Sequence, residues 1–133
     1  RLLENTHESV KLTLDTGHML FAKGDSKYIL QNYHERILHV HCKDIRKQVL
    51  EKSLKEDLSF RGAFLEGAFT VPGDGCIDYQ PLFNVLKNNN YSGWLVVEAE
   101  QDPAKANPLE YAKIGYNYLT DTLKKSEIEI YKN

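Results

Sequence analysis

The chain has 133 residues, of which 41% are hydrophobic and 27% charged, with a formal net charge of −2 at pH 7. This balance predicts one folded globular unit rather than a disordered or membrane chain. The lysines are scattered among acidic residues rather than gathered in one basic segment, so we expect no nucleic-acid partner. We expect a small-molecule partner instead.

Two features of the sequence bear on the compartment. Cys42 and Cys76 lack the paired spacing of a zinc site or a disulfide framework, which favours a reducing environment. No apolar run approaches the roughly 18 residues that span a bilayer. The first residues, RLLENTHESV, are charged where a secretory signal has its apolar centre. We therefore expect a cytoplasmic protein with no membrane partner.

The apolar pattern alternates between strand-like and helix-like spacing along the chain. Asp25 and Ser26 are typical helix-start residues, and Pro108 suits the first turn of a helix. In chain order the pattern predicts a strand over 10–14, a helix from about 25 to 35, a strand over 36–43, one or two helices within 44–69, a helix over 79–88, a strand over 93–100 and a helix over 108–125. The stretch TVPGDGCID predicts a turn that shapes a pocket mouth, without the glycine spacing of a phosphate-binding loop.

Alternating strands and helices predict an α/β protein with a parallel sheet. Three such units leave sheet edges uncovered. The chain begins on Arg1, in what resembles a helix already under way, so we expect a fragment of a larger domain. In parallel α/β folds, functional groups gather at the carboxyl ends of the strands. This chain places there Asp15 and His18, then His41, Lys43 and Asp44, then Glu98 and Glu100.

Aspartate, histidine and glutamate at the ends of three neighbouring strands form a mixed oxygen and nitrogen donor set that suits a divalent metal. Each residue alone can instead be a helix cap or a surface hydrogen-bonding group, but three equivalent positions favour the metal site. His39 shares a strand face with His41 and lies deeper in the strand, so we expect it to be packed or to support a ligand. Glu100 ranks second to Glu98 as a ligand.

Four stretches carry a family resemblance: LDTGH, HVHCKD, FTVPGDGCIDY and GWLVVEAEQDPAKANPLEYA. Together they resemble the xylose-isomerase-like TIM barrels, and the last two are similar to those of the inosose dehydratases in that superfamily. The resemblance implies a (β/α)8 barrel of which this chain covers about the last three βα units. Residues 1–133 would then be the C-terminal portion of a single domain, which needs the N-terminal barrel half as its partner.

The resemblance also implies a metal site. Enzymes of the family that this chain resembles bind one divalent metal through a glutamate, an aspartate, a histidine and a second glutamate. By motif, the last three fall on Asp15, His41 and Glu98, while the first glutamate has no counterpart here. The metal expected from the resemblance is Mn²⁺ or Co²⁺, with Zn²⁺ or Mg²⁺ as alternatives.

The activity that the resemblance implies is loss of water from 2-keto-myo-inositol in inositol catabolism, through a metal-stabilised enediolate. His18 and Lys43 are the candidates for proton transfer and substrate contact, with the acid and base roles left open. Arg46 is a further candidate for contact with polyol oxygens. Structural alternatives are a turn hydrogen bond for His18, a salt bridge with Asp44 for Lys43, and solvation of a helix start for Arg46.

Other functions compete with the dehydratase. A sugar isomerase or epimerase of the same superfamily would use the same metal and return the proton to carbon without expelling water. An inactive fragment that serves as a structural or interaction unit is the alternative from another class. A metal-dependent abasic-site endonuclease is disfavoured by the acidic balance. The oligomeric state is open, and a homo-oligomer is compatible with the sequence.

Overall fold

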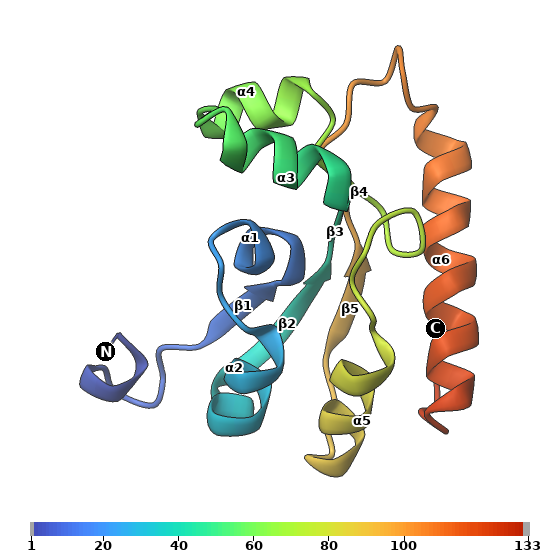
Figure 1. The fold of residues 1–133 in the computed structure, drawn as a ribbon. Helices are drawn as coiled ribbons and strands as arrows, with labels where there is room; N and C mark the ends of the chain where they lie inside the picture. Colours follow the sequence, from blue (N-terminus) through green and yellow to red (C-terminus); the bar gives the residue numbers. More distant parts are fainter. Residues whose placement is uncertain (1, 132–133) are drawn as a thin grey trace.

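A computed structural model describes residues 2–131, and a three-stranded parallel sheet forms its centre (Figure 1). Strands β1 (Leu12–Asp15), β2 (Ile37–Cys42) and β5 (Trp94–Val97) lie in the order β1-β2-β5. In this register Asp15 pairs with His41, and His41 pairs with Val96. The three predicted strands and their parallel arrangement are confirmed, although each strand is shorter than predicted.

Three helices cover one face of this sheet. They are α2 (Ser26–Tyr33), α5 (Gln80–Asn88) and α6 (Pro108–Lys125), with α2 beside α5 and α5 beside α6. The Asp25 side chain caps α2 by accepting a hydrogen bond from the Tyr28 N–H, as the sequence predicts. Short 3-10 turns over Leu3–Asn5 and His34–Arg36 precede β1 and β2. No helix in the described part of the chain is long and apolar enough to cross a membrane.

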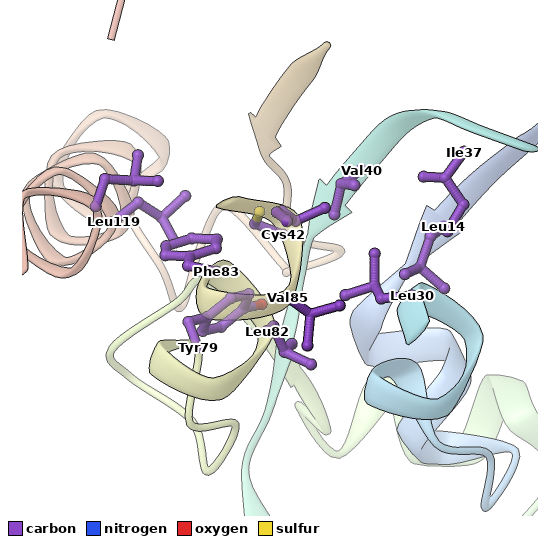
Figure 2. Packing of buried hydrophobic residues seen from close by; sticks show 12 residues of the cluster. Leu14, Leu30, Ile37, Val40, Cys42, Tyr79, Leu82, Phe83, Val85 and Leu119 are labelled. Carbon is purple, nitrogen blue, oxygen red and sulfur yellow. The ribbon is translucent and has the colours of Figure 1, made fainter. Parts of the chain in front are cut away.

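The core lies between the sheet and these helices (Figure 2). Strand residues Leu14, Val40 and Cys42 face the helices and are at most 2% exposed. Phe83 in α5 and Tyr79, the residue just before this helix, pack against these strand residues, and both are buried. Burial of each large apolar side chain contributes about 1.5–3 kcal/mol. Because side chains alternate along a strand, Asp15 and His41 point to the opposite face.

The segment after β1 is a short helix that the apolar pattern does not predict. Helix α1 (Thr16–Phe21) begins directly at the end of β1. The Oδ1 atom of Asp15 accepts a hydrogen bond from the His18 N–H at 2.8 Å, which caps the helix. Six residues are too few for apolar periodicity to reveal a helix, so the cap was its main signal in the sequence.

The insertion over 44–70 forms two helices, as predicted, together with a small sheet that was not predicted. Helices α3 (Lys47–Lys55) and α4 (Phe60–Leu65) lie beyond the carboxyl ends of β1 and β2 (Figure 1). Strands β3 (Asp44–Ile45) and β4 (Phe69–Thr70) pair in antiparallel fashion and join the insertion to the main sheet. Ile45, Ala63, Ala68 and Phe69, all 0% exposed, form its own apolar core.

The buried carboxylate of Asp44 holds the turn over 71–78. Its Oδ1 atom accepts hydrogen bonds from the backbone N–H groups of Ile45, Cys76 and Ile77 at 2.7, 2.9 and 2.9 Å. Burial raises the pKa of the Asp44 carboxyl, and these N–H groups oppose that rise. Asp44 is therefore a structural residue of the pocket mouth.

Replacing Gly75 with alanine is expected to destabilise the fold, because the added Cβ would overlap Asp44 Oδ1 and lie 2.8 Å from Asp44 Cβ. We expect a loss of about 1–3 kcal/mol in the free energy of unfolding, measured by urea denaturation. The control is Gly62→Ala in α4, where the nearest atom outside the helix backbone is 3.4 Å away. That variant should be as stable as the parent or more so, and equal stability of the two variants would contradict the prediction.

Candidate metal centre and active site

Three predicted ligands converge at the carboxyl ends of the three parallel strands. Asp15 ends β1, His41 lies near the end of β2, and Glu98 directly follows β5. Glu98 lies two positions beyond Val96, the register partner of His41, and so shares the same sheet face. One ligand atom from each of the three residues lies within 4.8 Å of the other two. The sequence predicted this grouping, and the structure brings the three side chains together.

The geometry of these three side chains suits a shared cation. His41 Nδ1 lies 2.9 Å from Glu98 Oε2 and 3.7 Å from Asp15 Oδ2. Glu98 Oε2 is a buried atom without a hydrogen-bond partner among the described residues, even though the imidazole nitrogen is close. Lone pairs that face one point without hydrogen bonding to one another are the arrangement that a metal ion satisfies. Two carboxylates and one imidazole fit Mn²⁺, Co²⁺ or Zn²⁺.

A buried lysine lies against this cluster. Lys43 is 1% exposed, and its Nζ atom lies 3.2 Å from Asp15 Oδ2, 3.3 Å from Glu98 Oε1 and 3.5 Å from Glu100 Oε2. One ammonium group therefore offsets part of the negative charge of three carboxylates. Among the described ion pairs, Lys43 is joined to these acids and not to Asp44, which was the structural alternative from the sequence.

Two buried hydroxyl groups fix the backbone of Lys43. Thr16 Oγ1 donates a hydrogen bond to the Lys43 carbonyl oxygen at 2.7 Å, and the Tyr79 hydroxyl donates to the same oxygen at 2.9 Å. The two hydroxyl groups are 2.8 Å apart. Burial raises the pKa of Tyr79 well above its usual range, so the phenol stays a neutral donor. Gly17 leaves room for the lysine stem, since a Cβ there would lie 2.7 Å from Lys43 Cγ.

Replacing Tyr79 with phenylalanine is expected to lower the free energy of unfolding by about 1–2 kcal/mol, because the buried Lys43 carbonyl loses a hydrogen-bond donor. Chemical denaturation checks the value. Tyr116→Phe is the matched control, since Tyr116 is 54% exposed, and it should shift stability by less than about 0.5 kcal/mol. Similar losses in both variants would contradict the assigned role of the buried hydroxyl.

His18 reaches the cluster from α1. Its Nε2 atom lies 2.8 Å from Lys43 Nζ, 3.7 Å from Glu100 Oε2 and 3.9 Å from Asp15 Oδ2. The hydrogen bond to Asp15 uses the His18 backbone N–H, so the imidazole stays available for other partners. His18 and Lys43, the two predicted catalytic residues, are thus direct neighbours at the edge of the three-ligand cluster.

Arg46 is engaged elsewhere. Its guanidinium group donates hydrogen bonds to Asp74 Oδ2 at 2.6 Å, to the Gly67 carbonyl at 2.8 Å and to Thr70 Oγ1 at 3.0 Å. It also lies over the Tyr111 ring, 5.9 Å from the centroid. These contacts tie the insertion to the turn over 71–78, so Arg46 has a structural role. Contact of Arg46 with substrate stays a prediction.

Two further residues are placed as the sequence indicated. The His39 ring packs edge-on against His41 at a centroid distance of 5.3 Å, as expected for a packed neighbour of a ligand. Glu100 faces Lys43 and His18 and is not part of the three-ligand group. Sequence reasoning missed Thr16 and Tyr79. Both lie in the stretches that carry the family resemblance, but their hydrogen bonds to Lys43 join parts of the chain that are distant in sequence.

A parallel sheet with converging carboxylate and imidazole groups at its carboxyl edge is the arrangement of metal-dependent β/α-barrel enzymes. The family model described as "Xylose isomerase-like TIM barrel" matches residues 1–122, and the chain belongs to this family. The fold class predicted from the sequence is thereby confirmed.

Within this family, the chain is similar in sequence to several curated inosose dehydratases. The chain is 53% identical over 122 residues to an inosose dehydratase of Clostridium beijerinckii, with 91% of this chain and 41% of the relative covered. It is 50% identical over 124 residues to that of Bacillus velezensis, with 92% and 42% covered. For Lactiplantibacillus plantarum the identity is 48% over 124 residues, with 92% and 41% covered. The chain therefore spans about two fifths of the length of the curated relatives it matches.

Proposed function

We propose that the protein is a metal-dependent lyase that removes water from 2-keto-myo-inositol. The observation that carries this proposal is the convergence of Asp15, His41 and Glu98 beside Lys43. It occurs in a chain that is similar to inosose dehydratases over nine tenths of its length. We place the activity in the cytoplasm, in keeping with the free thiols of Cys42 and Cys76.

Asp15, His41 and Glu98 would hold the divalent cation, with Mn²⁺ or Co²⁺ proposed. When bound, the cation supplies Lewis-acid stabilisation of negative charge on substrate oxygens. Among the described residues, β1 and β5 each have one neighbouring strand in the sheet. The proposal therefore assigns activity to the complete barrel, in which further strands pair with these two edges.

His18 and Lys43 would contact the substrate and carry its protons. The overall reaction breaks a C–H bond next to the ketone and a C–O bond at the following carbon. One group accepts the proton from carbon, and one donates a proton to the departing hydroxyl, which leaves as water. Because His18 Nε2 and Lys43 Nζ are 2.8 Å apart, both groups can reach one substrate.

The test is product analysis with the natural full-length protein, loaded with Mn²⁺ and incubated with 2-keto-myo-inositol. The expected product is an ultraviolet-absorbing dione, formed with metal and not after treatment with a chelator. An isomeric product formed without loss of water would support the isomerase or epimerase alternative. Absence of any reaction in the metal-loaded protein would contradict both.

A further inference from the structure

Three phenylalanine rings form an aromatic wall beside the site. Phe60 stacks on the His18 imidazole with a centroid distance of 5.7 Å and an interplanar angle of 28°, and Phe69 lies 5.2 Å from the same ring. Phe21 meets Phe60 edge-on at 5.5 Å. Lys43 Nζ lies 5.6 Å from the centre of the Phe69 ring. The wall therefore borders both proposed catalytic residues.

Phe60 is the exposed member of this wall. Phe69 is 0% exposed, whereas Phe60 is 47% exposed. Phe60 is the first residue of α4, whose start is capped by the Ser59 side chain. The helix is anchored by Ala63, which is 0% exposed and whose carbonyl accepts a hydrogen bond from the Ala68 N–H at 3.0 Å. Phe60 is thus held in place, while a large part of its side chain is not covered by the described residues 2–131.

We propose that Phe60 is a specificity-determining residue whose ring receives the apolar C–H face of a cyclic polyol. This inference rests on the proposed function and refines its substrate class. A polyhydroxylated six-membered ring has hydroxyl groups around its rim and C–H bonds on its faces. Aromatic rings in binding sites bind such apolar faces, while a few polar groups fix the orientation. Here the polar groups are His18 and Lys43, which lie directly beside the wall.

The arrangement predicts selectivity for cyclic over open-chain substrates. An open-chain ketose presents no flat C–H face, so it gains less from the Phe60 ring. A single cation held by Asp15, His41 and Glu98 would stabilise charge on substrate oxygens of either class, so it would not distinguish the two classes by itself. Phe60 lies in the insertion over 44–70, outside the parallel strands that position the ligands. The proposed selectivity for cyclic substrates therefore depends on the insertion, whereas the proposed metal ligands lie at the ends of the parallel strands.

The test compares Phe60→Leu, Phe60→Tyr and Leu65→Ala in the natural full-length protein loaded with Mn²⁺. Leucine keeps apolar volume at position 60 without an aromatic face, and tyrosine keeps the ring. Leu65 is in the same helix and 58% exposed, so it is the matched control. Titration calorimetry gives the Kd for 2-keto-myo-inositol, and steady-state assays give KM and kcat.

We expect Phe60→Leu to raise Kd and KM roughly 3- to 10-fold with kcat changed less than about twofold. Phe60→Tyr keeps the aromatic face, so it should raise Kd less than Phe60→Leu does, and Leu65→Ala should stay near the parent. An unchanged Kd in Phe60→Leu, or a fall in kcat alone, would overturn the inference while leaving the dehydratase assignment intact. If the parent binds 2-keto-myo-inositol without turnover, the proposed function fails and the Kd comparison still decides the role of Phe60. A parent that does not bind this ring compound overturns both.

Discussion

Replacing Asp15 with asparagine is expected to weaken Mn²⁺ binding by roughly 100-fold or more and to remove turnover. The reason is that a neutral amide oxygen replaces one of the two carboxylates in the three-ligand cluster. Glu98 and His41 would remain, and the uncharged amide oxygen of asparagine binds a divalent cation more weakly than the carboxylate oxygen that it replaces. Mn²⁺ titration followed by electron paramagnetic resonance measures the change in affinity, and the dione assay measures turnover.

Asparagine is chosen because Asp15 has two roles. Its Oδ1 atom caps α1 through the His18 N–H, whereas its Oδ2 atom faces His41 and Lys43. Asparagine is as good a cap as aspartate, so α1 should persist and the loss should be one of metal binding. Asp25→Asn is the matched control, since Asp25 caps α2 in the same way through the Tyr28 N–H.

Parent-like Mn²⁺ affinity in Asp15→Asn would refute the assignment of Asp15 as a ligand. A similar loss of affinity in Asp25→Asn would show that an aspartate-to-asparagine change outside the three-ligand cluster has the same effect, and would contradict the specific role of Asp15. Full turnover by Asp15→Asn in the absence of metal would contradict the whole three-ligand site.

Replacing Lys43 with methionine is expected to lower turnover by roughly 10²- to 10⁴-fold, the usual range for loss of a proton-transfer group. Metal affinity should be kept or increased in the same variant. The Lys43 ammonium lies within 3.3 Å of carboxylate oxygens of both Asp15 and Glu98, so it competes with a cation for the same charges. The Mn²⁺ titration and the dione assay separate these two effects.

The metal-free form of Lys43→Met should also be less stable than the parent. Removing the buried ammonium leaves three carboxylates close together without their cation. Mn²⁺ should then restore more stability to this variant than to the parent, as seen in thermal unfolding with and without metal. The control is Lys47→Met, whose lysine side chain is 71% exposed. Loss of metal binding in Lys43→Met, or parent-like turnover, would contradict the role proposed for Lys43.

The two variants together divide the site into separate functions. Asp15→Asn is expected to lose metal binding and turnover together, whereas Lys43→Met is expected to lose turnover and keep metal binding. This division follows from the geometry, since Asp15 belongs to the three-ligand group and Lys43 contacts that group from outside it. Neither result depends on which of His18 and Lys43 acts as the acid.

The sequence by itself determined the order of the three parallel strands and of the helices that follow α1, and the position of the metal-ligand candidates. Alternation of apolar residues reports the strands, and parallel strands place their carboxyl ends at one edge. Asp15, His41 and Glu98 each end or follow such a strand, so their meeting could be predicted. The family could also be recognised, because its motifs are continuous stretches of the chain.

Only the tertiary structure decided which groups the other site residues contact. Lys43 is joined to three carboxylates rather than to the adjacent Asp44, and Arg46 is occupied by the turn at Asp74. Thr16 and Tyr79 are 63 positions apart in sequence, yet their hydroxyl groups lie 2.8 Å from each other beside the Lys43 carbonyl oxygen. The spacing of apolar residues predicts which face of a helix or strand is buried. The hydrogen-bond partner of a buried polar group, in contrast, depends on segments that are distant in sequence. For that reason the ligands were predictable, and the hydroxyl pair and the Phe60 wall were not.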